Sequence, residues 1–463
     1  MDRYSLQQMI HLCKEGYCNK CCFEYIKGNA VESITYRQFA TDIEEAARIL
    51  SSTLKLGDKV VLIGENTYLW IVVNFAVVLN HCTLIPLDYD NTVDYISSIV
   101  NRVKATAVIQ IGSRYSIYLE DAREVRTPSG DFYLTYIYDR QEPSSCSYIF
   151  FTSGSTGRAK GVELSEESVF RSGYEAGFSF DLYESTYLCL PLSHIYAYCV
   201  VLLESLYKGI KIYLSSGMRY LFHELGIFQP DTIFLVPSLV ESIYDLRIKK
   251  EGIQAVFGKN LRTIFFGGGM IDGAYLDKYK QYGINLLNGY GTTETCGCIC
   301  MCTEQFNKKG SVGKPVLNTQ FRIINEEICV KTPHIMDGYF KDSESTREAF
   351  YGKWYRTGDS GYLDEEGYLF ITGRLRDIVA LPNGKNIYPV EIEDEILEID
   401  EVKAVKIRPH GKVLAAEIVP VDGREGVLSS IRLNVLDLNR RLPSYMHIQQ
   451  IIFIGEELCR GNN

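Results

Sequence analysis

The chain has 463 residues, of which 46% are hydrophobic and 23% are charged, and its formal net charge is −10 at pH 7. This length allows a large domain and a smaller one, and the hydrophobic content allows a substantial core. The negative charge argues against nucleic acid as a bulk partner. It does not exclude an anionic ligand, because individual loops can be positive in an acidic protein.

The sequence gives no sign of membrane targeting. Its start, Met-Asp-Arg-Tyr-Ser-Leu-Gln-Gln, lacks the basic segment and the apolar segment of a signal peptide. The longest apolar helical run, residues 69–79, contains Asn74 and is too short to span a bilayer. We therefore expect no transmembrane segment and a cytoplasmic location.

The 14 cysteines are expected to be thiols, because nothing in the sequence indicates an oxidising compartment. One cluster comprises His11, Cys13, Cys18, Cys21 and Cys22. It could begin a zinc site or consist of ordinary thiols, and no second ligand pair follows at zinc-finger spacing. A second cluster comprises Cys296, Cys298, Cys300 and Cys302. Their alternation predicts small apolar thiols on one face of a strand, packed within a sheet.

The N-terminal third of the chain alternates between helical and strand patterns. Apolar residues at helical spacing predict a helix over residues 35–54. The elements expected next are a strand at 59–63, a helix at 66–79, a strand at 83–87, a helix at 92–103 and strands at 106–111 and 148–151. Residues 112–146 are polar and are expected to form an irregular crossing segment. The alternation predicts a mostly parallel sheet with helices on its faces.

A loop rich in hydroxyls and glycines lies between the apolar strand at 148–151 and Lys160. Its residues are Thr152, Ser153, Gly154, Ser155, Thr156 and Gly157. Exposed backbone N–H groups, hydroxyl donors and a mobile ammonium group suit a polyphosphate. The spacing differs from that of the common P-loop, and a flexible surface loop is the alternative.

The alternation resumes after this loop and then changes to a β-rich pattern. Strands are expected near residues 187–190, 210–214, 232–236, 262–266 and 284–288, with helices between them. Short strands at 321–324, 327–330, 354–357, 361–363 and 368–371 predict a β-rich subdomain over about residues 311–371. The predicted fold class is α/β: a large N-terminal domain, residues 1–375, followed by a small mobile α/β lid, residues 376–463.

Side chains suited to nucleotide binding follow two of the expected strands, where ligands of α/β folds lie. In the stretch Asn-Gly-Tyr-Gly-Thr-Thr-Glu at 288–294, Tyr290 offers a flat face for a base and Glu294 a hard oxygen for magnesium. A glycine turn with an exposed acid is the alternative. Asp359 also ends a strand, and its carboxylate can accept both hydroxyls of a ribose. A plain surface aspartate is the alternative there.

Several stretches resemble, in the right order, motifs of the adenylate-forming superfamily, which includes acyl-CoA synthetases, luciferases and peptide-synthetase adenylation domains. The main ones are residues 148–165, 288–294, 355–359 and 381–393. The resemblance runs over nearly the whole chain, and the chain looks most like the acyl-CoA synthetases.

The resemblance implies roles for the residues of these motifs. The loop at 152–157 and Lys160 would hold the phosphates of ATP. Tyr290 would lie against adenine, and Gly268 and Gly269 would lie under it. Such glycines would allow close approach of the backbone, although a plain turn also uses them.

The same resemblance implies a metal site, a ribose site and a hinge. In the motif at 288–294, Gly291 and Thr292 would belong to the nucleotide site. Thr293 would lie near the α-phosphate, and Glu294 would hold Mg²⁺. The last implied residues are Asp359 at the ribose, Arg374 near the ribose and phosphates, and Arg376 at the pivot of the lid.

His194 and its neighbours resemble the family's segment that borders the acyl pocket. His194 would stand near the incoming carboxylate or thiol, and a structural histidine is the alternative. Amino-acid-activating relatives place an aspartate in this region, whereas this segment has none. The resemblance therefore points to a fatty, aryl or other simple carboxylic acid rather than to an amino acid.

The implied lid departs from the family at its end. The family carries a lysine there that contacts the carboxylate and the α-phosphate. In this chain Leu442 and Pro443 begin a similar approach, but the sequence stops at Asn463, apparently just before that lysine. The lid is therefore expected to be cut short, either in the gene product or by truncation.

The resemblance as a whole implies an AMP-forming acid–thiol ligase. Such an enzyme uses ATP and Mg²⁺ to convert a small carboxylic acid to an acyl-adenylate and then transfers the acyl group to a thiol, here expected to be that of coenzyme A. A close alternative is a stand-alone adenylation enzyme that loads the phosphopantetheine of a carrier protein. The missing lysine suggests a different alternative, a non-catalytic ATP-binding relative.

Overall fold

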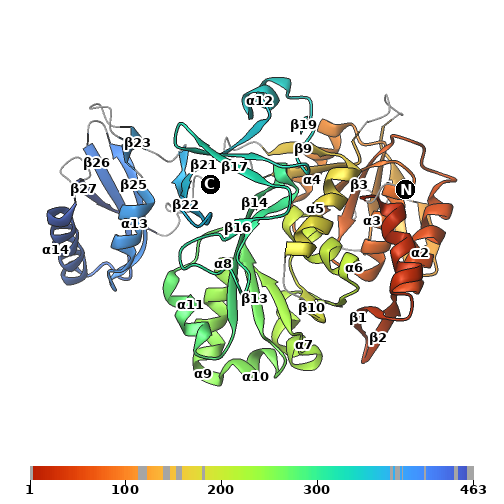
Figure 1. Cartoon of the computed structure of the whole chain (residues 1–463), viewed down its shortest axis with the longest axis horizontal. Helices are drawn as coiled ribbons and strands as arrows, with labels where there is room; N and C mark the ends of the chain where they lie inside the picture. Colours follow the sequence, from red (N-terminus) through yellow and green to blue (C-terminus); the bar gives the residue numbers. More distant parts are fainter. Residues whose placement is uncertain are drawn as a thin grey trace. The chain divides into compact units, whose positions relative to one another are not determined.

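The computed structural model describes residues 4–112, 123–138, 146–152, 159–179, 183–375, 379–380, 386–387, 389–410, 413–442 and 447–455. The chain forms two compact units (Figure 1). Unit 1 comprises residues 1–152, 160–320 and 331–353, and unit 2 comprises residues 153–159, 321–330 and 354–463. The predicted α/β class is confirmed.

The first sheet of unit 1 has eight strands in the order β19-β9-β8-β4-β3-β5-β7-β6. Their bounds are β3 Lys59–Gly64, β4 Thr83–Asp88, β5 Ala107–Gln110, β6 Arg123–Thr127, β7 Gly130–Tyr136, β8 Tyr148–Thr152, β9 Lys160–Leu164 and β19 Gly338–Tyr339. Strands β3, β4, β5 and β8 pair in parallel, and the edges are antiparallel. The alternating pattern predicts a mostly parallel sheet, but three of the described pairings are parallel and four are antiparallel, because hairpins extend the parallel centre at both edges.

Threonine caps fix the starts of three helices in this part of unit 1. The helices are α2 Tyr36–Leu50, α3 Tyr68–Leu79 and α4 Val93–Val103. The side chains of Thr35, Thr67 and Thr92 each accept a hydrogen bond from a backbone N–H in the first turn. These bonds satisfy donors that have no partner inside a helix, so each helix begins at a defined residue. All three agree with the predicted helices to within four residues at either end.

The prediction that residues 112–146 are irregular is wrong for the part that the structure describes. Strands β6 and β7 form a hairpin there, and β7 pairs with β5. Val125, Phe132 and Leu134 are buried. They alternate with polar residues on an edge of the sheet, so the segment reads as polar although every second side chain points inward.

The second sheet of unit 1 has nine strands in the order β16-β15-β14-β13-β12-β10-β11-β1-β2. Their bounds are β1 Cys21–Lys27, β2 Ala30–Thr35, β10 Ser185–Leu188, β11 Lys211–Leu214, β12 Thr232–Leu235, β13 Thr263–Gly267, β14 Asn285–Thr292, β15 Gly297–Met301 and β16 Lys314–Pro315. The five strands predicted between residues 187 and 288 are all present. The central strands pair in parallel, so their carboxyl ends lie along one edge.

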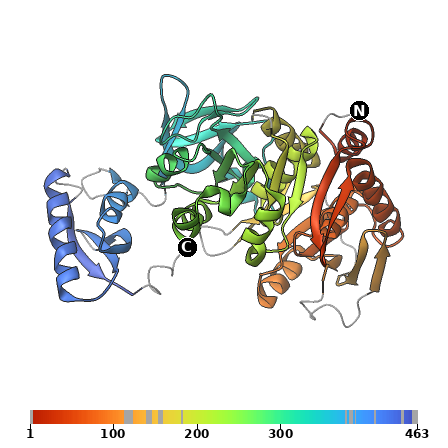
Figure 2. The same cartoon turned by 90° about the horizontal axis from the view of Figure 1, so that it is seen from below.

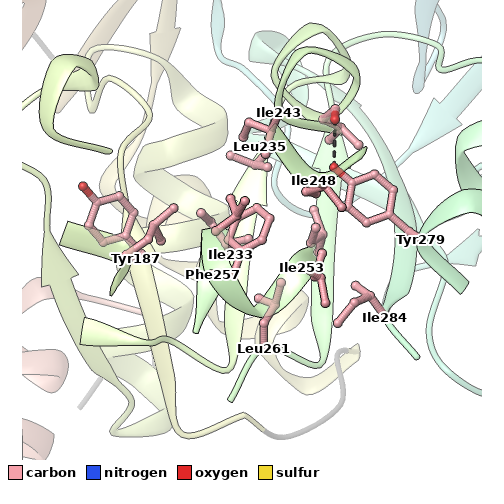
Figure 3. Packing of buried hydrophobic residues seen from close by; sticks show 14 of the residues in the cluster. Tyr187, Ile233, Leu235, Ile243, Ile248, Ile253, Phe257, Leu261, Tyr279 and Ile284 are labelled. Atoms are coloured by element: carbon pink, nitrogen blue, oxygen red, sulfur yellow. Dashed lines mark hydrogen bonds between the residues drawn. The ribbon is translucent and has the colours of Figure 1, made fainter. Parts of the chain in front are cut away.

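One face of this second sheet packs against helices in a large apolar core. Ile233 and Leu235 of β12 and Ile264 of β13 point into it. Figure 3 shows the apolar side chains that pack around Ile233 and Leu235 in this core. In the same core the Tyr279 hydroxyl donates a hydrogen bond to the Val240 carbonyl at 2.8 Å. Because one face is held this firmly, the strand ends are rigid supports for a ligand site.

Unit 2 contains the β-rich part and the C-terminal α/β part. Its elements are β17 Gln320–Ile324, β18 Glu327–Lys331, β21 Trp354–Leu363, β22 Leu369–Arg374, α13 Pro389–Leu397, β25 Val402–His410, β26 Val413–Pro420, α14 Glu425–Arg441 and β27 Ile448–Phe453. In Figure 2 the long helix α14, in deep blue, lies along the sheet of β25, β26 and β27. Ile431 and Val435 of α14 share a buried cluster with Ile418 of β26.

Two details of the β-rich part differ from the prediction. The strands expected at 354–357 and 361–363 are one strand, β21, whose register shifts between Ser360 and Gly361. A side chain at Gly361 would lie 2.2 Å from the Phe370 carbonyl oxygen, so glycine allows the continuous pairing. In addition, residues 331–353 group with unit 1, because β19 pairs with β9 of the first sheet. The hinge at Arg376 lies outside the described residues.

The cysteines of the described residues are free thiols. All four members of the cluster at 296–302 are buried, and burial raises the pKa of Cys298 to about 12. Cys298 and Cys300 lie within β15, whereas Cys296 precedes the strand in a left-handed conformation and Cys302 follows it, so burial of all four thiols is confirmed but their placement along one strand is not. Among the described residues, no group of three histidine, cysteine or acidic side chains is arranged to hold a metal ion. Nor does any described helix have the length and apolarity to cross a membrane.

Glu204, at the start of α6 (Glu204–Lys208), is an acid in the interior of unit 1. Its side chain is fully buried, accepts a hydrogen bond from Tyr183 and lies 3.1 Å from the Lys208 ammonium group. Burial raises the pKa of Glu204 to about 7, against the lowering effect of Lys208. The folded protein therefore holds a proton on this group at a pH where the unfolded chain has released it.

We expect Glu204→Gln to change the pH dependence of stability. The wild type should lose on the order of 3 kcal/mol between about pH 4.3 and pH 7, as the pH rises through the folded-state pKa of Glu204. Glutamine cannot ionise, so the melting temperature of the variant relative to wild type should be more favourable at pH 8 than at pH 5. Glu15→Gln, at an exposed position, is the matched control. An equal effect of Glu204→Gln at both pH values would contradict the assignment.

Candidate active site

Lys160 lies at the start of β9, directly after the glycine-rich loop. Its ammonium group donates to the Ser345 hydroxyl at 3.0 Å and lies 4.7 Å from the ring centre of Tyr339. Tyr339 pairs with Val162, because β19 is the antiparallel neighbour of β9 (Figure 1). A cation–π contact and one hydrogen bond therefore hold the ammonium group on a partly exposed surface.

Glu294 lies in a short turn, Thr293–Thr295, that follows β14. The turn is closed by a reciprocal capping box between Thr292 and Thr295. The Tyr339 hydroxyl donates to Glu294 Oε1 at 2.8 Å. Tyr339 thus contacts both Lys160 and Glu294, and these two predicted site residues meet around one tyrosine.

Tyr290 and Gly291 lie within β14, so the predicted nucleotide motif begins in a strand rather than in a loop. Tyr290 is only 9% exposed, so little of the residue reaches the surface. A side chain at Gly291 would lie 1.5 Å from the Gly297 carbonyl oxygen of β15. The glycine is needed for close strand pairing, whatever the motif binds.

Gly268 and Gly269 follow β13 and are exposed. Gly268 has φ +83°, a conformation that favours glycine, and nothing lies within 4 Å of the position where its side chain would begin. At Gly269 the nearest atom to that position is Pro237 Cγ, at 3.4 Å. This pair therefore leaves open backbone at the carboxyl edge of the parallel strands, as a base-binding surface requires.

His194 is exposed and lies just before the helical segment η2, Tyr196–Leu203. The preceding segment is held by Asn66, whose amide donates to the Leu190 carbonyl and accepts from the Leu192 N–H. Asn66 is the first residue of the helix expected over residues 66–79, but that helix is capped by Thr67. Asn66 instead fixes the backbone just before His194, whose side chain is exposed.

Asp359 and Arg374 form an ion pair within unit 2. Arg374 Nε lies 2.8 Å from Asp359 Oδ1, and Arg374 Nη1 donates to the Thr357 carbonyl at 3.3 Å. Asp359 is 3% exposed, whereas the side chain of Arg374 is 47% exposed. The two residues are neighbours because Asp359 of β21 pairs directly with Arg374 of β22.

Some predicted residues lie outside the described part of the chain. They are Ser153, Gly154, Ser155, Thr156, Gly157 and Arg376. The end of the loop that is described is Thr152, which pairs with Lys160 across β8 and β9. Thr292 and Thr293 are partly exposed beside Glu294.

A sequence comparison assigns this chain to a known protein family. The model of the family described as "AMP-binding enzyme" matches residues 13–340. This chain belongs to that family. The match includes Lys160, Glu294 and Tyr339, the residues that meet at the junction of the two sheets.

Curated relatives of this AMP-binding enzyme include CoA ligases. It is 34% identical over 305 residues to the 2-succinylbenzoate–CoA ligase of Listeria innocua, an alignment that spans 62% of this chain and 63% of the relative. It is 23% identical over 466 residues to the long-chain-fatty-acid–CoA ligase FadD15 of Mycobacterium bovis, spanning 84% of this chain and 77% of the relative. The chain thus spans less than two thirds of the length of the first relative.

Solved structures share the fold of this AMP-binding enzyme. The o-succinylbenzoate CoA synthetase MenE of Bacillus subtilis, in complex with the acyl-adenylate intermediate OSB-AMP, superposes with a TM-score of 0.78 at 21% identity. That match covers 96% of this chain and 94% of the other. A fatty acyl CoA synthetase of Mycobacterium tuberculosis gives a TM-score of 0.74 at 22% identity, covering 98% and 95%. At these identities the likeness supports the fold.

Sequence reasoning missed Tyr339 and Ser345 as parts of the site. Both lie in residues 331–353, which the sequence analysis assigns to the β-rich subdomain, yet β19 belongs to the first sheet. In the sequence, the Gly338-Tyr339 pair was the feature that could have indicated this part of the site. A side chain at Gly338 would lie 2.9 Å from Thr346, so the glycine lets the helix Ser343–Glu348 pack against β19.

We expect two glycine substitutions in the AMP-binding enzyme to differ sharply in their effect on folding. Gly291→Ala should destabilise unit 1 by roughly 3 kcal/mol or more, because its side chain would overlap the β15 backbone. Gly269→Ala should change stability by less than about 0.5 kcal/mol, because its position is open. Thermal unfolding of both purified variants tests this contrast. Equal melting temperatures would contradict the described pairing of β14 with β15.

Proposed function

We propose that this AMP-binding enzyme is an AMP-forming acid–thiol ligase. The observation that carries the proposal is the cluster of Lys160, Tyr339 and Glu294 in a chain of this family. It combines a cation for phosphate with a hard oxygen for a metal, and the same unit carries the open backbone of Gly268 and Gly269. Such a site suits a magnesium-bound nucleotide triphosphate.

The proposed reaction has two steps. A carboxylate oxygen of the acid attacks the α-phosphorus of ATP, the bond from that phosphorus to the bridging oxygen breaks, and pyrophosphate leaves. A thiol, as thiolate, then attacks the acyl carbon of the acyl-adenylate, and AMP leaves. Both steps exchange one leaving group for another without redox change, so the protein contributes chiefly positioning and charge stabilisation.

The site residues of unit 1 would divide this work by their chemistry. Lys160 would donate to phosphate oxygens and offset negative charge as pyrophosphate departs. Tyr290 would lie against adenine, and the open backbone at Gly268 and Gly269 would lie under it. Thr293 would donate to the α-phosphate, next to Glu294.

The residues around Glu294 fit a magnesium ion. Mg²⁺ takes oxygen ligands and is usually held by one or two carboxylates together with phosphates and waters. Glu294 supplies such a carboxylate, and its Oε1 is already oriented by the Tyr339 hydroxyl. When bound there, Mg²⁺ would neutralise charge on the polyphosphate.

In unit 2 the pair of Asp359 and Arg374 suits a ribose and a phosphate. A buried carboxylate can accept both ribose hydroxyls, and the half-exposed guanidinium can reach a neighbouring phosphate. We propose that residues near Arg376 form the hinge of a C-terminal lid that begins at residue 376. Movement there would separate the two half-reactions.

The substrate class follows from the relatives and from one feature of the sequence. The relatives are named for 2-succinylbenzoate and for long-chain fatty acids. The segment around His194 contains no aspartate that could bind an α-ammonium group. We therefore propose an aryl or fatty carboxylic acid, with coenzyme A as the acceptor because both relatives are named as CoA ligases. Loading of a carrier protein is the second candidate.

The first test is pyrophosphate release from ATP and Mg²⁺ across a panel of acids. The full chain should release pyrophosphate with 2-succinylbenzoate or with fatty acids, and not with amino acids. Lys160→Ala should lower kcat/KM for ATP by roughly a hundredfold, because it removes a cation aimed at phosphate. Lys249→Ala, at an exposed position, is the control. ATP binding with no acid-dependent release would favour the non-catalytic alternative, and transfer to a carrier protein but not to coenzyme A would favour the second candidate.

The ribose assignment is tested by pairing a protein change with a nucleotide change. The wild type should bind ATP about tenfold or more tightly than 2′,3′-dideoxy-ATP, because a buried carboxylate accepts the two hydroxyls. Asp359→Asn should remove most of that preference, while Asp131→Asn, at an exposed position, should retain it. Isothermal titration calorimetry measures all six affinities. A preference that survives in Asp359→Asn would rule out the ribose contact.

A further inference from the structure

Tyr339 joins the two charged side chains of the unit 1 site. Its hydroxyl donates to Glu294 Oε1 at 2.8 Å, and its ring centre lies 4.7 Å from the Lys160 ammonium group. Among the described residues, the hydrogen-bond and ring partners of the Lys160 ammonium group are Ser345 and Tyr339, and the Glu294 carboxylate accepts from the Tyr339 hydroxyl. A direct pair would neutralise both groups and compete with a ligand for each of them. Tyr339 instead gives each charge a neutral partner.

Tyr339 belongs to a segment that contacts the Glu294 turn at more than one point. We call residues 334–339 the strap. The backbone N–H of Met336 donates to the Glu294 carbonyl at 2.7 Å, and His334 Nδ1 lies 3.0 Å from the Thr295 carbonyl oxygen. Together with the Tyr339 hydroxyl, the strap therefore holds the backbone and the side chain of Glu294 at once.

His334 makes its contact from a fully buried position. A carbonyl oxygen only accepts, so His334 Nδ1 carries the proton in the bond to Thr295. Burial lowers the pKa of His334, which favours the neutral ring. Its other nitrogen faces Glu175 Oε2 at 3.9 Å, and Glu175 Oε1 accepts from Arg171 and Asn318. At 3.9 Å this second contact is no hydrogen bond, and His334 Nε2 has no hydrogen-bond partner among the described residues, so the bond to Thr295 is what orients the ring.

We propose that Tyr339 is a positioning residue that holds the carboxylate of Glu294 and the ammonium group of Lys160 apart and oriented for one magnesium-bound polyphosphate. The strap keeps Tyr339 in place. This inference rests on the proposed function in assigning the metal to Glu294. The orientation matters because hydrogen-bond partners of metal ligands fix the ligand, and their loss weakens metal binding by about 10- to 100-fold.

A binding measurement on two variants distinguishes the role of the Tyr339 hydroxyl from that of the Tyr339 ring. ATP affinity is measured by calorimetry with Mg²⁺ and again with EDTA, and the ratio of the two affinities reports the metal's contribution. Tyr339→Phe removes the donor to Glu294 but keeps the ring at Lys160. Its ratio should fall about tenfold, with unchanged affinity in EDTA. Tyr339→Leu should also weaken ATP binding in EDTA, because Lys160 loses its aromatic partner.

Two substitutions test the strap through His334. The amide N–H of His334→Asn can occupy the place of Nδ1–H and keep the bond to Thr295. The amide of His334→Gln reaches toward Glu175 instead and gives up that bond. His334→Asn should therefore keep the wild-type ratio within about twofold, whereas His334→Gln should lower it as Tyr339→Phe does. A purely structural role would lower both melting temperatures and leave the two ratios equal, which would overturn the strap's part in the proposal.

The matched control is Tyr282→Phe, which removes an exposed hydroxyl and should change nothing. A wild-type ratio near one, or a Tyr339→Phe ratio equal to that of wild type, would overturn the inference. If Tyr339→Phe lowers the ratio while the wild type releases no pyrophosphate with any acid, the positioning role stands and the proposed ligase activity fails. The two failures are therefore distinguishable.

Discussion

The hydrogen bond between Tyr339 and Glu294 is the contact on which the arrangement of the unit 1 site depends. It joins an edge strand of the first sheet to the turn that follows β14 of the second sheet. Tyr339 is positioned by its pairing with Val162, two residues beyond Lys160 on the same strand. The register of β9 and β19 therefore fixes the places of the cation and the carboxylate together, and neither depends on a long flexible loop.

Glycines serve two different purposes around this contact. Gly291 is required by the protein itself, because any side chain there would overlap the backbone of β15. At Gly268 nothing lies within 4 Å of the place of a side chain, and at Gly269 only Pro237 does, at an ordinary contact distance of 3.4 Å. A glycine-rich motif in the sequence does not distinguish these cases. The close approach of β14 and β15 requires a glycine at position 291, whereas Gly268 and Gly269 leave exposed backbone after β13.

Much of the fold could be predicted because its signals are local. Helices capped by Thr35, Thr67 and Thr92 begin where the sequence indicates, and buried parallel strands such as β12 are continuous apolar runs. The hairpin of β6 and β7 was missed because only alternate residues face inward. Tyr339 was missed for a different reason, since its partners are distant in the sequence and no periodicity reveals which strand an edge residue will join. The roles of Gly268 and Asp359 came from the family resemblance and stay predictions.

The candidate site residues are oriented by contacts within their own unit. Lys160 and Glu294 are held through Tyr339 in unit 1, and Asp359 is held by Arg374 across two paired strands in unit 2. Neither set needs the other unit to keep its geometry. For a two-step reaction this is an advantage, because a rearrangement between the steps would leave each set intact. Most of the ordering entropy of each set of side chains is then lost during folding, so a ligand of either set need not supply it on binding.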